Sequence, residues 1–95
     1  MSRQFYVYIM TNQADHVLYT GVTNDLKKRV WQHRSGIGSE FTKRYNVHKL
    51  VYYEIAEEAY AAISREKQIK AGSRQKKRDM VNGFNPEWCD LYNGL

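Results

Sequence analysis

Near the start of the chain, two apolar runs flank a short polar segment. The runs FYVYIMT (5–11) and VLYTGVT (17–23) are rich in β-branched and aromatic residues, which favour strands, and NQADH (12–16) supplies turn formers. The pattern predicts a β-hairpin. Tyr8 and Tyr19 share one face of this hairpin if the numbers of paired residues sum to an odd value, whereas an even register separates them. The polar gap permits either register.

The segment after the hairpin is typical of a helix. TNDLKKRVWQHRSG (23–36) offers Thr23 or Asn24 as the N-cap, places Asp25 in the first turn, and ends at Gly36.

The second half of the chain predicts one more strand and several helical segments. They are, in order, a single turn from Ser39, a strand over 47–56, a long helix over 57–72, a short helix over 74–83 capped by Ser73, and a final turn at Pro86. This order predicts an α+β fold in which helices flank a three-stranded antiparallel sheet. With 95 residues and no internal repeat, the chain is expected to form a single domain over 1–95.

The composition narrows the compartment in which the chain is expected to work. Its one cysteine, Cys89, cannot form an internal disulfide, so we expect no disulfide-linked partner and a reducing, cytoplasmic environment. The sequence contains no apolar run of the length that a signal peptide or a membrane span requires, so no membrane association is expected.

Positive charge is concentrated in one part of the chain. The net charge is +5, and between Arg65 and Arg78 the only acid is Glu66. A basic run of this kind raises the local concentration of polyanions, of which nucleic acid is the most common in a cytoplasm. A merely solvated helix face is an equally good interpretation of the run taken alone.

Two residues of the first predicted helix carry side chains that could bind a phosphate or transfer a proton. Arg29 and His33 lie four residues apart, beside the apolar pair Leu26 and Val30. Facing a cleft, the guanidinium could bind a phosphate and the imidazole could exchange a proton near neutral pH. The spacing alone favours plain packing roles for both side chains.

Glu66 interrupts the apolar face of the long predicted helix. Ala59, Ala62, Ile63 and Ile69 trace that face, and the helical step places Glu66 in its middle. A carboxylate there needs a cation, because burying an unpaired charge is costly. The cation could be a basic side chain such as Arg29 or a lysine, or a hard divalent metal such as Mg²⁺, which needs few protein ligands.

Tyr8 and Tyr19 by themselves fit ordinary half-buried strand aromatics. Together with Arg29, His33 and Glu66 they form the set that phosphodiester cleavage requires. One group deprotonates water, one neutralises the phosphate, and a metal stabilises the leaving oxygen.

These residues resemble the GIY-YIG nuclease family, in particular its small stand-alone bacterial branch, over nearly the whole chain. Tyr6-Val7-Tyr8 stands in the place of the first signature and Tyr19-Thr20-Gly21 in the place of the second, so both are altered but keep their tyrosines. The spacing from Tyr19 to Arg29 and His33 is also similar. Glu66, in SREKQIKAG, resembles the family's metal-binding glutamate, and Asn85, in FNPEW, resembles the asparagine that closes the site.

The resemblance implies an endonuclease that depends on Mg²⁺ or Mn²⁺ and acts on DNA, with a structure-selective role in DNA repair or processing. Water attacks phosphorus, with either Tyr8 or His33 as the base, while Arg29 balances the phosphate charge and the metal held by Glu66 stabilises the departing 3′-oxygen. The implied catalytic residues are Tyr8, Tyr19, Arg29, His33 and Asn85.

A chain of this length leaves no room for a separate DNA-binding domain, so its own basic side chains must select the substrate. The candidates for nucleic-acid binding are Lys43, Arg44, Lys70, Arg74, Lys76, Lys77 and Arg78. Two alternatives remain open at this point. One is a nucleic-acid-binding module without cleavage activity on the same scaffold, and the other is an RNA-processing nuclease.

Overall fold

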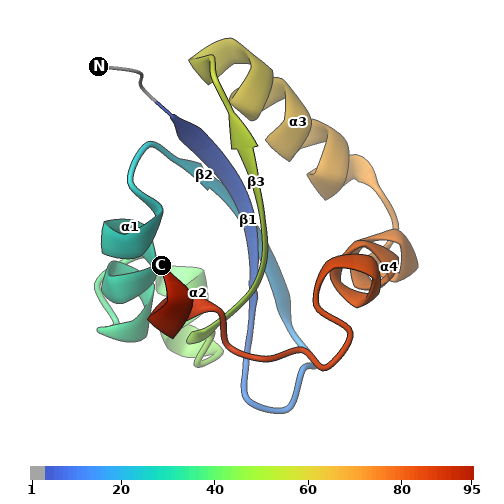
Figure 1. The fold of residues 1–95 in the computed structure, drawn as a ribbon. Coiled ribbons are helices and arrows are strands. Elements are labelled where there is room, and N and C mark those ends of the chain that lie inside the picture. The colour runs from blue at the N-terminus through green and yellow to red at the C-terminus, as the bar shows by residue number, and fades with distance from the viewer. Residues whose placement is uncertain (1–3) are drawn as a thin grey trace.

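A computed structural model describes residues 4–95 and contains a three-stranded antiparallel sheet with helices on both sides (Figure 1). The strands are β1 (Phe5–Thr11), β2 (Leu18–Thr23) and β3 (Lys49–Ala56), in the spatial order β2-β1-β3. The helices are α1 (Leu26–Arg34), α2 (Glu40–Arg44), α3 (Ala59–Ala71) and α4 (Arg74–Phe84), followed by the 3₁₀ turn η1 (Tyr92–Gly94). The predicted α+β class and the order of strands and helices are confirmed.

The central strand β1 contributes to a core on each face of the sheet. Val7 and Ile9 pack with residues of α3 and α4, whereas Tyr8 and Met10 pack with the α1 side chain Val30 and its neighbours. Side chains alternate between the two faces of a strand, so one strand serves both cores. Figure 1 shows the same division, with α1 and α2 on one side of the sheet and α3 and α4 on the other.

The hairpin register places the two tyrosines on the same face. Tyr8 pairs with Gly21 and Met10 pairs with Tyr19, so paired numbers have an odd sum. Tyr19 therefore lies one diagonal step from Tyr8, on the face that α1 covers.

The first residues of the helices follow the capping rules, with one correction. Asp25, and not Thr23 or Asn24, is the N-cap of α1, because its carboxylate accepts a hydrogen bond from the backbone N–H of Lys28. Thr23 is still the last residue of β2, and its hydroxyl accepts from the N–H of Asp25. The predicted cap Ser73 is confirmed, since its hydroxyl accepts from the N–H of Lys76. Ser39, where a helical turn was predicted to start, is the N-cap of α2 and accepts from the N–H of Thr42.

The chain after α4 corrects a second expectation. No helical turn begins at Pro86; the segment is irregular until η1 starts at Tyr92. Trp88 has a φ of +55° and its N–H bonds back to the carbonyl of Asn85, so the chain reverses instead of continuing as a helix. Further on, the N–H of Leu91 donates to the carbonyl of Leu50, which ties this segment to β3.

Asn85 fastens this reversal to an irregularity in the sheet. Ile9 pairs with Tyr52 and Met10 pairs with Leu50, so Val51 is an extra residue at a β-bulge. The buried Asn85 amide donates to the carbonyl of Val51 at 3.2 Å and to that of Cys89 at 2.8 Å. Its oxygen accepts from the N–H of Cys89 at 3.1 Å.

Replacement of Asn85 by Ala should destabilise the fold, because it leaves buried backbone groups at the bulge without partners. We expect a loss of about 2 to 3 kcal/mol in the free energy of unfolding, measured by chemical denaturation. The exposed Asn93 provides the control, and Asn93→Ala should change stability by less than about 0.5 kcal/mol. Equal effects of the two substitutions would contradict a bracing role for Asn85.

Candidate active site

The centre of the candidate site is a hydrogen bond between the sheet and α1. The hydroxyl of Tyr8 lies 2.9 Å from Nε2 of His33, and both side chains are almost completely buried. The ring of Tyr19, from β2, lies 5.1 Å from the His33 ring and 6.3 Å from the Tyr8 ring, centroid to centroid. Three elements distant in sequence thus bring two phenols and an imidazole together.

Two glycines make room for this cluster. A Cβ at Gly21 would lie 2.4 Å from the Tyr8 hydroxyl oxygen, and a Cβ at Gly38 would lie 2.4 Å from Nδ1 of His33. Neither position can carry a side chain without displacing the cluster. The glycine of the second signature is therefore explained by the close approach of Tyr8 to β2.

The far side of His33 contacts a residue that sequence reasoning missed. Nδ1 of His33 lies 2.9 Å from Oγ1 of Thr42, which is itself fully buried on α2. Thr42 also bonds to Ser39, the N-cap of α2. The capping pattern at Ser39 was visible in the sequence, but the approach of α2 to His33 is a tertiary contact that no local pattern encodes.

Arg29 lies beside the cluster and influences its protonation. It is half-buried, donates to Oε1 of Gln32 at 3.0 Å, and lines a shallow pocket of about 210 Å³ near the start of α1. Burial raises the pKa of Tyr8 well above its ordinary value, with Tyr19 adding to the rise and Arg29 opposing it. Burial lowers the pKa of His33 to about 4, and the charge of Arg29 acts in the same direction.

The protonation states follow from these shifts. At neutral pH the imidazole of His33 is uncharged and the phenol of Tyr8 keeps its proton. The cluster is therefore an uncharged donor and acceptor pair beside a guanidinium. Such a pair can accept one further proton from a neighbouring molecule by shifting the phenolic proton to the imidazole.

Glu66 lies on α3. Its charge makes the smallest of the contributions that shift the pKa of Tyr8, in the upward direction. The side chain is 15% exposed, and Oε2 lies 3.4 Å from Nζ of Lys70, a half-exposed lysine one turn further along the helix. The ammonium group of Lys70 is thus one cation that Glu66 contacts, as expected for one of the two alternatives.

The surroundings of Glu66 correct the expected apolar face. Ala62 and Ile69 are buried, but Ala59 is exposed and Ile63 is 44% exposed, so Glu66 lies at the margin of the buried face and not in its middle. A carboxylate with access to solvent fits a hard divalent cation that keeps most of its waters. No group of three His, Cys, Asp or Glu side chains gathers within residues 4–95, so Glu66 would be the main protein ligand.

The structure does not bring Asn85 to this cluster. Its amide is engaged with backbone on the α3 and α4 side of the sheet, whereas Tyr8 and His33 lie on the α1 side. The asparagine can act on the candidate site only by bracing the backbone.

Several of the basic residues are engaged in contacts within the fold. Arg65 forms an ion pair with Glu54 at 2.9 Å. The guanidinium groups of Arg74 and Arg78 donate to the backbone carbonyls of His16 and Asp15 in the turn between β1 and β2. Lys76 and Lys77 line a small cavity with Arg65 and Ile69, and Lys70 is next to Glu66.

A row of aromatic rings leads from the cluster to the surface. Phe41 lies 5.8 Å from Tyr19, and Tyr45 lies 4.9 Å from Phe41, centroid to centroid. Phe41 and Tyr45 are 41% and 42% exposed, and the guanidinium of Arg44 lies 5.6 Å from the Tyr45 ring. Lys43 is exposed on the same short helix. Sequence reasoning found Lys43 and Arg44 but not the aromatic row.

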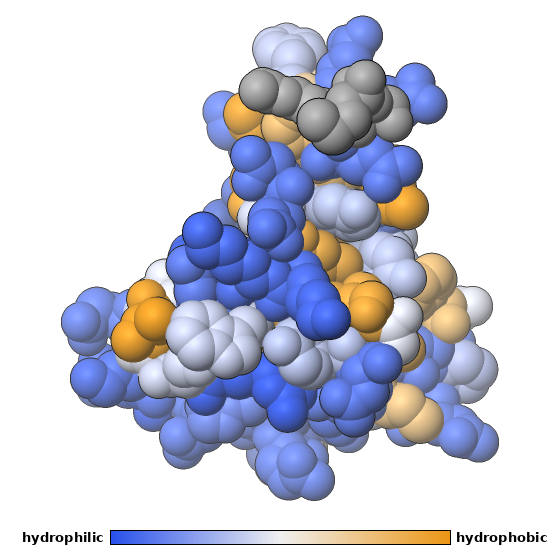
Figure 2. All heavy atoms as spheres, turned by 60° about the vertical axis from the view of Figure 1, so that its left-hand side comes forward, coloured by the Kyte–Doolittle hydropathy of each residue, from blue (hydrophilic) through white to orange (hydrophobic). Residues whose placement is uncertain are grey.

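The surface on the α1 side is mainly hydrophilic. Figure 2 turns this side forward and shows hydrophobic side chains in small separate groups. The exposed large hydrophobic residues of α1, α2 and the loop between them are Trp31, Ile37, Phe41 and Tyr45.

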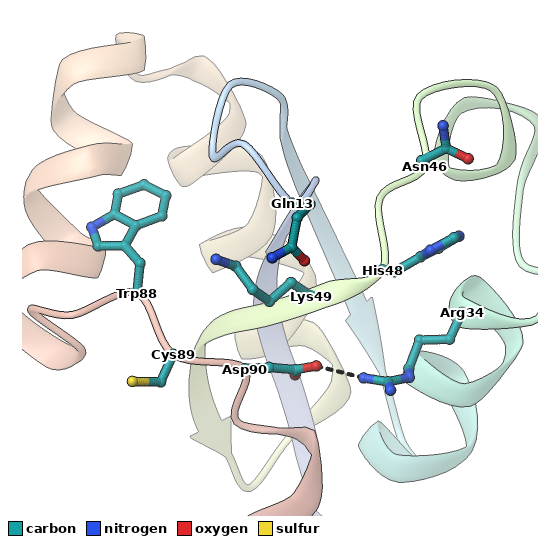
Figure 3. Close-up of a pocket in the computed structure, with 8 residues that line it drawn as sticks. All are labelled: Gln13, Arg34, Asn46, His48, Lys49, Trp88, Cys89 and Asp90. Carbon is teal, nitrogen blue, oxygen red and sulfur yellow. Dashed lines mark hydrogen bonds and ion pairs between the residues drawn. The ribbon is translucent and has the colours of Figure 1, made fainter.

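A cavity larger than the pocket beside Arg29 lies elsewhere. It has a volume of about 570 Å³ and is lined by the start of β3, the end of α1 and the segment after α4 (Figure 3). Two of its charged side chains, Arg34 and Asp90, form an ion pair, and Lys49 pairs with Asp15 at 2.7 Å. These charges are already neutralised, so size alone does not make this cavity the functional site.

Comparison with known proteins identifies the family of this chain. Residues 4–79 match the model of the GIY-YIG catalytic domain, and this range includes Tyr8, Tyr19, Arg29, His33 and Glu66. The chain belongs to the GIY-YIG family. It is a family of nucleases that generally depend on divalent metals. Within residues 4–95, no helix is long and apolar enough to cross a membrane.

Relatives of similar length support this membership. A UPF0213 protein of Haloquadratum walsbyi is 39% identical over 81 residues, which cover 85% of this chain and 90% of that protein. A UPF0213 protein of Clostridium perfringens is 42% identical over 77 residues, covering 81% and 82%. The solution NMR structure of a UPF0213 protein from Bacillus halodurans has a TM-score of 0.54 and 28% identity, covering 96% of this chain and 93% of that chain.

The buried state of His33 predicts how stability changes with pH. Its pKa is about 4 in the folded chain and 6.5 in the unfolded chain, so the unfolded chain binds more protons between these values. The stabilisation is present above pH 6.5 and is lost as the pH falls toward 4. Between about pH 7.5 and about pH 5 we expect His33 to account for a loss of about 2 kcal/mol in the free energy of unfolding.

Denaturant titrations of the wild type and of His33→Gln at the two pH values test this expectation. The variant should show a smaller loss, whereas substitution of the exposed His48 by Gln should leave the wild-type loss intact. Equal losses in the wild type and His33→Gln would show that His33 does not titrate in this way.

Proposed function

We propose that this chain is an endonuclease that hydrolyses DNA phosphodiester bonds with the help of Mg²⁺ or Mn²⁺, in DNA repair or processing. We also propose that residues 1–95 form a single nuclease domain that works in the cytoplasm. The observation that carries the proposal is the buried Tyr8–His33 hydrogen bond, with Arg29 beside it and the Glu66 carboxylate nearby. A chain that only bound nucleic acid would have no use for this neutral proton-accepting pair.

The pair supplies the base for the attacking water. In the proposed step the Tyr8 oxygen takes a proton from water while the Tyr8 proton passes to Nε2 of His33. The water oxygen forms a bond to phosphorus, and the bond from phosphorus to the 3′-oxygen breaks with its electron pair on that oxygen. The 3′-oxygen takes a proton from solvent, and the His33 imidazolium returns its extra proton to solvent. The products carry a 5′-phosphate and a 3′-hydroxyl. In this proposal Tyr8 and His33 act together as one base.

Two charged residues handle the phosphate. Arg29 would balance the negative charge that develops on the phosphoryl oxygens, and its half-buried position strengthens that effect. Glu66 would hold the divalent metal, which supplies stabilisation of negative charge on the departing oxygen. Tyr19 would orient the phosphate from the same face of the hairpin as Tyr8.

The aromatic row favours a structure-selective substrate. Nucleobases stack on exposed aromatic rings only where they are unpaired or splayed out, and such stacking contributes about 1 to 3 kcal/mol per base. Phe41 and Tyr45 offer two such rings, with Lys43 and Arg44 available to the backbone phosphates. We therefore expect branched or single-stranded DNA to be cut faster than uniform duplex. Faster cleavage of RNA would redirect the proposal to RNA processing.

Cleavage of single-stranded, duplex and branched DNA and of RNA, with and without Mg²⁺, tests the proposal directly. The decisive variant is Glu66→Gln. It should abolish Mg²⁺-dependent cleavage with a stability change of less than about 0.5 kcal/mol, because the ion pair with Lys70 is a helical pair of low energetic value.

Substitution of the exposed Glu57 by Gln is the matched control and should retain cleavage. If Glu66→Gln instead unfolds the chain and the residual folded fraction still cuts, Glu66 is structural. If the wild type binds DNA but cuts nothing with Mg²⁺ or Mn²⁺, the chain is a binding module.

Salt dependence distinguishes the basic residues that contact phosphates from those that brace the fold. Each phosphate contact contributes about 0.7 to 0.9 to the slope of log affinity against log salt. We expect the double variant Lys43→Gln/Arg44→Gln to flatten this slope by about 1.5 with little effect on the melting temperature.

The matched double variant Arg74→Gln/Arg78→Gln removes the same charge from α4. Because both guanidinium groups bond to the turn between β1 and β2, it should lower the melting temperature and alter the slope less. A reversed pattern would move the nucleic-acid interface from α2 to α4.

A further inference from the structure

In the reaction proposed above, Nε2 of His33 accepts a proton, so the protonation state of Nδ1 matters. A neutral imidazole carries its proton on either Nδ1 or Nε2, and only a bare Nε2 can accept the proton of Tyr8. The hydrogen bonds of Nδ1 therefore decide whether His33 can serve as a base. In this chain Nδ1 faces Oγ1 of Thr42 at 2.9 Å.

The bonds around Thr42 favour a proton on Nδ1. The Thr42 hydroxyl donates to the backbone carbonyl of Ser39 at 3.2 Å, and Ser39 Oγ lies 2.9 Å from Thr42 Oγ1. A hydroxyl has one proton and two lone pairs. With its proton on the Ser39 carbonyl, Thr42 accepts from the Ser39 hydroxyl and from Nδ1–H of His33, and every group in the network is satisfied.

The bonds around Tyr8 favour the same tautomer. Within residues 4–95, the hydrogen-bond partner of the Tyr8 hydroxyl is Nε2 of His33. Arg29, the nearby cation, has donors only. A proton on Nε2 would leave the buried phenolic proton without an acceptor among the described residues, which is costly for a buried donor. The hydrogen bonds at the two ends of the imidazole thus favour the same tautomer, and each contributes part of the preference.

We propose that Thr42 is a positioning residue whose hydroxyl accepts the Nδ1 proton of His33 and so keeps the Nε2 lone pair directed at the Tyr8 hydroxyl. The short helix α2 holds this hydroxyl in place. Ser39 caps the helix through the N–H of Thr42 at 3.1 Å, and the absent side chain of Gly38 lets the preceding loop close against Nδ1. The effect of Thr42 on cleavage rests on the proposed function, whereas the tautomer assignment does not.

Nuclear magnetic resonance of the ¹⁵N-histidine-labelled chain tests the assignment without any nuclease assay. Long-range proton–nitrogen correlations distinguish the two neutral tautomers. The wild type should show His33 protonated on Nδ1, and Thr42→Val, which keeps the shape but removes the acceptor, should shift His33 toward the other tautomer. Thr42→Ser should restore the wild-type pattern.

Thr11→Val is the matched control, because Thr11 is equally buried but donates to the carbonyl of Val17, away from His33. It should leave the His33 signals in the wild-type tautomer. An unchanged tautomer in Thr42→Val would overturn the proposal. Should that variant fail to fold, the wild-type spectrum still decides, since a proton on Nε2 of His33 is incompatible with the assigned network.

Kinetics on a cleaved DNA substrate give the second readout. Residues that orient a functional imidazole typically affect activity by about 10- to 100-fold. Thr42→Val should lower kcat by such a factor with little change in KM, and Thr42→Ser should recover most of it. If no variant and no wild type cleaves DNA, the proposed function fails while the tautomer assignment stands. If cleavage occurs but Thr42→Val keeps wild-type kcat, the positioning role fails.

Discussion

The hydrogen bond between Tyr8 and His33 is the interaction on which the candidate site depends. It joins the central strand to α1 through a pair of polar groups that are both almost completely buried. Burial of such groups is tolerated only when each finds a partner. The glycines at 21 and 38, the arrangement of α2 and the odd hairpin register all serve to bring these partners together. Burial requires each polar group of the pair to have a hydrogen-bond partner. Burial also disfavours the charged forms of both side chains, and the proposed proton transfer starts from this uncharged state.

The sequence predicted the elements of the fold well because their signals are local. Alternating apolar residues marked the strands, and Ser39 and Ser73 marked two helix starts. Among the candidate site residues, Tyr8, Tyr19, Arg29 and His33 were predicted from their combined chemistry and from the resemblance to the family's motifs, because neither the hairpin register nor the helical spacing decided the matter alone. Thr42, Phe41 and Tyr45 were missed because their relation to His33 and Tyr19 depends on how α2 packs, which the sequence pattern does not encode.

Other expectations failed because long-range partners decided the outcome. Arg74 and Arg78 belong to a basic run, yet their guanidinium groups bond to the turn at residues 15–16, more than fifty residues earlier in the chain. Pro86 is a good helix start in isolation, but the reversal at Trp88 and the bonds of Asn85 hold that segment against β3. Glu66 lies at the margin of the buried face because its neighbour Ile63 remains partly exposed.

The segment after α4 extends the fold beyond the residues that match the family model. The match to the family model stops at residue 79, but the structure continues to attach later residues to the core. Asn85 satisfies the bulge in β3, Leu91 bonds to Leu50, and Asp90 pairs with Arg34 at the end of α1, one residue after His33. A fragment that ended at residue 79 would keep the candidate site residues Tyr8, Tyr19, Arg29, His33 and Glu66. It would lose the segment over 85–91, whose hydrogen bonds and ion pair connect β3 and α1. The family model therefore covers less of this chain than the fold that holds the candidate site together.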